Sequence, residues 1–149
     1  MIWMYAICVC GGEESNVCAA LKKENIKCHL PRTTIAERKG GEWHKKEKPL
    51  IPGYVFIESI LTPEIYYKVK EMAHVRGWVG KGQPSPMTGE DAEFILQMAN
   101  NGEAIPMLMF DSPYLKKAII RSVDKRHFRI KATIMVMGKT HTVTFGYLG

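Results

Sequence analysis

The chain has 149 residues, of which 46% are hydrophobic and 24% are charged, and its formal net charge is +6. This length suits one ordinary domain or two small ones, and the composition is that of a globular protein. No apolar run approaches the roughly 20 residues that a membrane span requires. The first ten residues lack a basic region and a small-residue cleavage site, so we interpret them as a strand and expect a cytoplasmic protein.

The positive charge is unevenly divided along the chain. Residues 1–102 hold 13 Lys and Arg against 12 Asp and Glu, whereas residues 103–149 hold 8 against 3. Nearly all of the excess therefore lies in the last third, where we expect a polyanion to bind. A solvated basic surface without a partner is the alternative.

The four cysteines do not form a recognisable metal or redox motif. Cys8, Cys10, Cys18 and Cys28 include no C-x-x-C pair, and buried free thiols fit them better than zinc or a disulfide. Cys28 and His29 are neighbours on an expected strand, so their side chains point to opposite faces. The chain also has no Walker loop, dinucleotide glycines or H-E-x-x-H. We expect no metal, no cofactor and no catalysis.

The first elements after the N-terminal strand are a helix, a short strand and a hairpin. Residues 13–25 have acids in the first turn and lysines in the last, which predicts a helix. Residues 27–30 form a short strand. Residues 32–38 and 43–48 flank a glycine turn that is typical of a hairpin. The hairpin is polar and charged, so we expect it to project into solvent.

The next segment predicts an apolar docking surface. The turn Pro52-Gly53 is followed by a strand from Tyr54 to Ile57 that is apolar in both registers. If Val55 and Ile57 face the core, the other register forms an apolar patch, which usually marks a docking site. Plain core residues are the alternative. The expected patch comprises Ile51, Tyr54 and Phe56.

Two further helices and a strand complete the first part of the chain. Thr62-Pro63-Glu64 is a clear helix start, and the helix extends to about residue 72. A strand follows at residues 75–79, and Thr88 begins a third helix that stops near residue 100. This order predicts an α+β fold with helices packed on an antiparallel sheet.

The last part of the chain contains strands only. They are expected at residues 117–123, 128–137 and 140–147, which suggests a small curled barrel. We therefore expect a first domain at residues 1–99, a linker at residues 100–107 and a barrel at residues 108–149. These expected boundaries follow the change in periodicity.

In this order the chain resembles the NusG family of transcription elongation factors. The resemblance rests on Tyr5–Val9 with Gly12-Glu13-Glu14, Leu30-Pro31-Arg32, Pro49–Ile57, Thr62-Pro63-Glu64 and Gly77-Trp78-Val79-Gly80. It implies a NusG N-terminal domain, which is an α/β sandwich with an antiparallel sheet, and a C-terminal KOW domain with an SH3-like barrel. The turns Asp124-Lys125-Arg126 and Met137-Gly138-Lys139 resemble those of the specialised antiterminators of the LoaP type, and the RfaH type is an alternative. The KOW opening is degenerate, since it reads Asp111-Ser112-Pro113-Tyr114.

The resemblance implies that the first domain binds the clamp helices of the largest RNA polymerase subunit. The expected contacts are Ile51, Tyr54 and Phe56, with Cys8 beside them. A protein that also reaches the opposite side of the polymerase cleft through residues 62–72 would hold the clamp closed and suppress pausing or termination. His74 and Arg76 would lie near non-template DNA, although a lone arginine is also an ordinary surface charge.

The basic C-terminal region is the expected RNA-binding site, because cations can follow phosphates and aromatic rings can stack on bases. Resemblance to LoaP implies a structured leader element in the nascent RNA. Ordinary KOW domains bind ribosomal protein S10 or Rho, and both remain candidate partners of this domain. We expect the protein to be a monomer. The rival interpretation is a ribosome- or RNA-associated KOW protein without polymerase binding. The expected RNA contacts are Lys116, Lys117, Lys125, Arg126, His127, Arg129 and Lys139, with Tyr114 and Phe128 among them.

Overall fold

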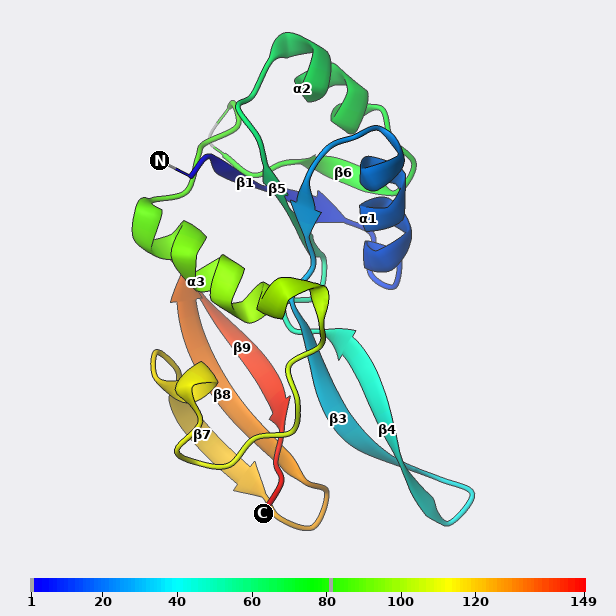
Figure 1. Cartoon of the computed structure of the whole chain (residues 1–149), viewed down its shortest axis with the longest axis vertical. Helices are drawn as coiled ribbons and strands as arrows, with labels where there is room; N and C mark the ends of the chain where they lie inside the picture. The colour runs from blue at the N-terminus through cyan, green and yellow to red at the C-terminus, as the bar shows by residue number, and fades with distance from the viewer. Residues whose placement is uncertain (1, 81) are drawn as a thin grey trace. The chain divides into compact units, whose positions relative to one another are not determined.

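The computed structural model describes residues 2–80 and 82–149. It confirms the order of helices and strands expected from the sequence (Figure 1). The chain forms two compact units, of which the first contains residues 1–30 and 52–96 and the second contains residues 31–51 and 97–149. Residues 31–51 therefore pack with the C-terminal part of the chain.

The first unit is a four-stranded antiparallel sheet with the strand order β2-β5-β1-β6. Its helices are α1, α2 and α3, and α3 continues into the second unit. The strands are β1 (Met4–Val9), β2 (Cys28–His29), β5 (Tyr54–Glu58) and β6 (Val75–Trp78), and the helices are α1 (Glu14–Lys23), α2 (Pro63–Lys70) and α3 (Gly89–Ala99).

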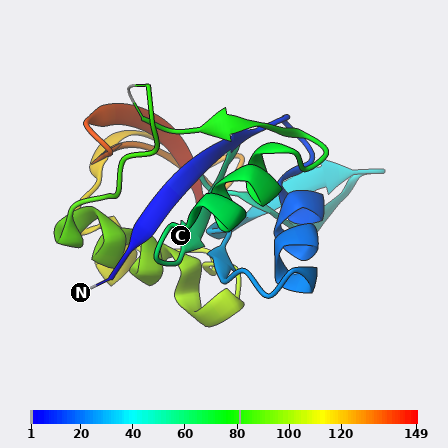
Figure 2. The same cartoon turned by 90° about the horizontal axis from the view of Figure 1, so that it is seen from above.

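The core of this unit lies between one face of the sheet and the helices α1 and α2, which lie side by side (Figure 2). Every second residue of β1 and β5 points into it, because side chains alternate across a strand. Helix α1 contributes one stripe of apolar residues, as an amphipathic helix does. The buried core residues include Ile7, Val9, Val17, Leu21, Val55, Ile57 and Val69.

The expected helix start at Thr62 is confirmed. The Thr62 hydroxyl accepts a hydrogen bond from the Ile65 amide at 3.2 Å, and Pro63 occupies the first helical position. Thr88 accepts from the Asp91 amide at 3.2 Å in the same way at the start of α3. These caps satisfy amide groups that have no partner within the helix.

The second unit contains an antiparallel sheet, β7-β8-β9, and the two-stranded hairpin β3-β4. One face of the larger sheet is apolar, and its buried residues include Ile130, Ala132, Ile134, Val143 and Phe145. Single bridges join Thr33 to Ile105 and Leu108 to Tyr147. The strands are β3 (Arg32–Lys39), β4 (Glu42–Pro49), β7 (Ile119–Asp124), β8 (Arg129–Val136) and β9 (Lys139–Gly146), and short 3-10 turns lie at Asn100–Gly102 and Pro113–Leu115.

The expectation that the hairpin projects into solvent is wrong for β3. Thr33, Ile35 and Ala36 are buried, whereas β4 is exposed along most of its length. The base of β3 packs against the end of β9, where a Cβ atom on Gly146 would lie 2.1 Å from the Thr34 carbonyl oxygen. Only a residue without a side chain allows this approach, so Gly146 permits the hairpin to pack on the C-terminal sheet.

The structure shows the state of the cysteines, and it also shows whether any described helix could cross a membrane. Cys18 and Cys28 are buried thiols, as expected, with their sulfur atoms 2.9 Å apart, whereas Cys8 and Cys10 are only half-buried. The hydrogen bond from Cys18, with burial, raises the pKa of the Cys28 thiol. Within the described residues, no helix is both long and apolar enough to span a bilayer.

We predict that Gly146→Ala destabilises the chain by about 1–3 kcal/mol, because the added methyl group would overlap main-chain atoms. Where the backbone and the surrounding space allow a methyl group, replacing Gly by Ala ordinarily stabilises a protein. The sign of the change in unfolding free energy therefore tests the contact of Gly146 with Thr34. Urea unfolding followed by circular dichroism measures it. Gly11→Ala is the control, since a Cβ atom there would meet nothing within 4 Å. Equal stability of both variants would contradict the close packing of β3 on β9.

Candidate functional site

The first candidate surface is the face of the four-stranded sheet that points away from α1 and α2. The strand register places Cys8 opposite Tyr54, and Ala6 opposite Phe56. Cys8 and Tyr54 are half-buried. This face therefore brings together three of the four expected polymerase contacts, and two of them are partly accessible.

The expectation that Phe56 and Ile51 form an exposed patch is wrong. Phe56 is 0% exposed and Ile51 is 3% exposed. Strand β5 lies between β2 and β1, and three consecutive residues from Val55 onward are buried. A short run that is apolar in both registers is typical of a strand buried on both faces, which explains the error. Ile51 belongs to the second unit.

A hydrogen-bonded pair that the sequence did not indicate lies beside Phe56 on this face. His29 is opposite Phe56 in the register, and its Nε2 atom is 2.8 Å from the Glu58 carboxylate. The hydrogen bond with His29 lowers the pKa of Glu58, and the nearby Lys27 ammonium acts in the same direction. Only the pairing of β2 with β5 brings these groups together, so residue spacing gave no signal for them.

The two expected DNA contacts lie in the first unit. His74 has a left-handed backbone, with φ at 68°, and its Nε2 atom is 3.7 Å from the Glu13 carboxylate. Arg76 is exposed on β6. The structure places both residues at the surface of the same unit, with the His74 ring beside the Glu13 carboxylate.

The second candidate surface is the turn between β7 and β8. Lys125, Arg126 and His127 are exposed there, and the half-buried Arg129 follows them; we call these four residues the turn cluster. Asp124 orients His127, because its carboxylate accepts from the His127 amide at 3.1 Å and lies 2.7 Å from the ring. This contact lowers the pKa of Asp124.

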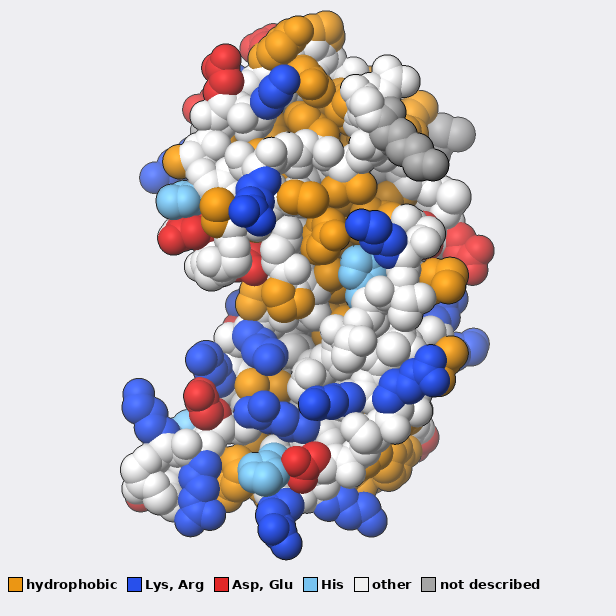
Figure 3. Space-filling view, turned by 180° about the vertical axis from the view of Figure 1, so that it is seen from behind, with side chains coloured by type: hydrophobic (Ala, Val, Ile, Leu, Met, Phe, Trp, Pro, Cys, Tyr) orange, Lys and Arg blue, Asp and Glu red, His pale blue; other side chains and the backbone are white. Residues whose placement is uncertain are grey.

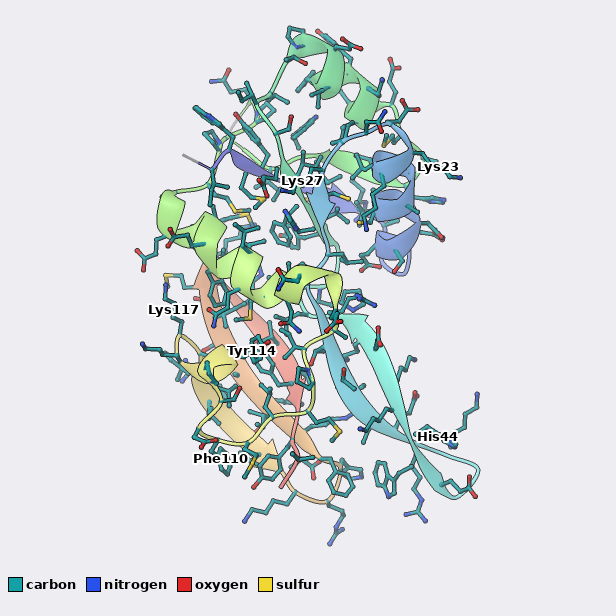
Figure 4. All side chains as sticks on the ribbon, in the orientation of Figure 1. Lys23, Lys27, His44, Phe110, Tyr114 and Lys117 are labelled. Atoms are coloured by element: carbon teal, nitrogen blue, oxygen red, sulfur yellow. The ribbon has the colours of Figure 1, made fainter. Side chains whose placement is uncertain are left out.

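The remaining expected RNA contacts lie at the other end of the sheet. Lys139 is opposite Val136, at the end of β8 that is farther from Arg129. Eight residues of strand separate the two ends by on the order of 20 Å. Lys116 and Lys117 precede β7, and Figure 4 shows Lys117 away from the hairpin that carries His44. The structure therefore divides the seven expected residues into two groups.

Two aromatic residues expected among these cations are held by contacts within the second unit. The Tyr114 hydroxyl donates to the Asn100 side chain at 2.5 Å. Phe128 packs edge to face with Trp43 of the hairpin, with ring centroids 5.1 Å apart. Tyr114 is thus fixed by a hydrogen bond, whereas Phe128 joins the hairpin to the turn cluster.

The hairpin adds cations to the second unit that the sequence assigned to the first domain. The Arg129 guanidinium donates to the Ala36 carbonyl at 3.5 Å, which brings the turn cluster to β3. Burial lowers the pKa of Lys48, and the neighbouring charges of Arg129 and Lys46 lower it further. Cations from distant parts of the chain are therefore close enough to repel one another.

The division of charge between the units is sharper than the sequence alone indicated. The second unit holds 14 Lys and Arg against 6 Asp and Glu, which gives +8. The first unit holds 7 against 9, which gives −2. Figure 3 shows blue side chains gathered over the part of the molecule formed by the second unit. Such a surface attracts polyanions.

Comparisons with known proteins identify the family of this chain. Residues 1–96 match the family model described as "Transcription termination factor nusG". The chain is 25% identical over 163 residues to the transcription termination/antitermination protein NusG of Vibrio cholerae, covering 93% of this chain and 89% of that protein. It is 22% identical to the protein of the same name from Escherichia coli K12, covering 96% and 92%. The chain therefore belongs to the NusG family.

A solved structure supports the fold along the whole chain. It is described as "Domain interaction in Thermotoga maritima NusG", has a TM-score of 0.63 and 20% sequence identity, and covers 98% of this chain and 94% of that one. The expected α+β fold with antiparallel sheets is confirmed, and the C-terminal β-rich region fits a KOW or SH3-like domain. The protein is thus a NusG-like transcription termination/antitermination factor.

Proposed function

We propose that this protein is an elongation and antitermination factor that holds RNA polymerase through its first unit and nascent RNA through its second. The division of charge carries this proposal, because +8 and −2 on two units of one chain suit two different partners. The relatives named above support a role in termination or antitermination. The factor acts by binding, so it shifts polymerase between paused and active states without chemistry.

The proposed polymerase contact is the accessible part of the sheet face that carries Tyr54 and Cys8. A tyrosine ring supplies a large contact area at small entropic cost, which is why tyrosine is common at the centre of protein interfaces. Phe56 then supports Tyr54 from within the fold instead of touching the partner. The clamp helices of the largest subunit are the proposed partner, since an exposed helix pair can bury apolar side chains against such a face.

The proposal includes specialisation of the LoaP type. The turns at Asp124-Lys125-Arg126 and Met137-Gly138-Lys139 support it, because they resemble those of a LoaP-type KOW domain. The KOW opening departs from the family pattern, and in its place Pro113–Leu115 form a 3-10 turn that Ser112 caps by accepting from the Tyr114 amide. A structured leader RNA is the proposed ligand of the turn cluster. We keep non-template DNA as the proposed partner of Arg76 and His74, and ribosomal protein S10 as a further partner of the second unit.

One observation favours a second candidate function, namely an RNA-associated KOW protein that does not bind polymerase. The burial of Ile51 and Phe56 removes most of the apolar area that a helical partner would cover. The positive charge of the second unit would serve this alternative equally well. Binding of polymerase therefore distinguishes the two candidates.

We predict that Tyr54→Ala weakens binding to core RNA polymerase by about tenfold or more, as loss of a central aromatic contact does. Biolayer interferometry with immobilised polymerase measures the affinity, and circular dichroism verifies the fold. Met135→Ala is the control, because Met135 is a highly exposed apolar residue on the C-terminal sheet. Wild-type protein that fails to bind polymerase would favour the RNA-associated alternative.

For RNA, we predict that wild-type affinity for a stem–loop falls steeply with salt. In the double variant Lys125→Gln/Arg126→Gln, the dependence on salt becomes weaker: the magnitude of the slope of log K against log[salt] falls by about 1–2, because two phosphate contacts are lost. Lys22→Gln/Lys23→Gln on α1 removes the same charge from the first unit and should leave the slope unchanged. An affinity independent of salt would eliminate the proposed RNA function.

A further inference from the structure

The tip of the hairpin carries an aromatic and cationic cluster outside the expected RNA contacts. Arg38 is opposite Trp43 in the register, and its guanidinium lies 5.9 Å from the centre of the Trp43 ring. Trp43 is 39% exposed. Part of the indole surface therefore remains accessible to a partner.

The same ring touches the turn cluster. Trp43 meets Phe128 at 5.1 Å with an interplanar angle of 87°, and it meets His127 at 6.3 Å with an angle of 69°. These contacts join the tip of the hairpin to the turn between β7 and β8 within the second unit. Aromatic rings and cations from two distant segments of the sequence therefore form one surface.

The charges of this surface are available to an anionic ligand. Glu37 pairs with Lys46 at 3.6 Å, and Asp124 is occupied by His127. Within residues 2–80 and 82–149, no carboxylate forms an ion pair with the side chains of Arg38, Lys125 or Arg126. An accessible indole with Arg38 over its ring, and with Lys125 and Arg126 in the adjoining turn, matches a chain that alternates phosphates with flat bases.

We propose that the hairpin tip and the turn cluster form one binding site for single-stranded RNA, in which Trp43 stacks on an unpaired base. This inference rests on the proposed RNA function and extends its site to the hairpin. Arg38 and the turn lysine and arginine contact the phosphates on either side of that base. Paired bases have their faces covered by neighbouring base pairs, so the site selects a single strand or an unpaired loop.

The test measures the affinity of the full chain for fluorescein-labelled oligouridylate of 12 nucleotides by fluorescence anisotropy at several salt concentrations. Trp43→Leu keeps an apolar contact with Phe128 but removes stacking, and it should weaken binding about fivefold or more. Trp43→Tyr retains a ring and should recover most of that affinity. Arg38→Gln should reduce the salt slope by about 0.7, the value for one phosphate contact with a single strand.

Lys23→Gln is the matched control, since it removes one exposed cation from α1 in the first unit (Figure 4). Its affinity and salt slope should equal those of the wild type. Equal binding by Trp43→Leu and wild type, or equal loss in the Leu and Tyr variants, would overturn base stacking. Tighter binding of oligodeoxythymidylate than of oligouridylate would overturn the assignment to RNA. If one of these results overturned the single-strand site while the wild-type protein still bound the stem–loop, the proposed RNA function would stand without it.

Discussion

The close approach of β9 to the main chain of β3 determines how the second unit is built. Gly146 lies against the Thr34 carbonyl, where any side chain would overlap it. Arg129 is opposite Gly146 in the register and reaches the Ala36 carbonyl, and farther along the hairpin Trp43 meets Phe128. One position without a side chain thus allows a charged hairpin to become part of the C-terminal body.

This packing has an electrostatic consequence. Lysines of β4 are brought near Arg129, and the resulting repulsion contributes to the lowered pKa of Lys48. Bringing like charges together costs free energy in the isolated protein, and a bound polyanion would recover it. The proposed binding of RNA to the second unit depends on this concentration of cations.

The sequence was sufficient for the elements but not for their packing. Caps and turns such as Thr62-Pro63 and Gly40-Gly41 act locally, so helix starts and hairpin turns were predicted correctly. The burial of Phe56 was not predicted, because periodicity cannot distinguish a strand covered on both faces from one with an exposed apolar patch. The hairpin contacts depend on residues far apart in the chain, and the same is true of the pair formed by His29 and Glu58.

The most direct test of the account is a titration of the ¹⁵N-labelled full chain with oligouridylate, followed by amide chemical shifts. The account predicts that shifts change together at residues 37–46 of the hairpin and at residues 124–131 around the turn cluster. The chemical shifts of the amides of α1 and of the four-stranded sheet should not change. Shift changes confined to residues 1–30 and 52–96 would contradict the assignment of RNA binding to the hairpin and the C-terminal sheet.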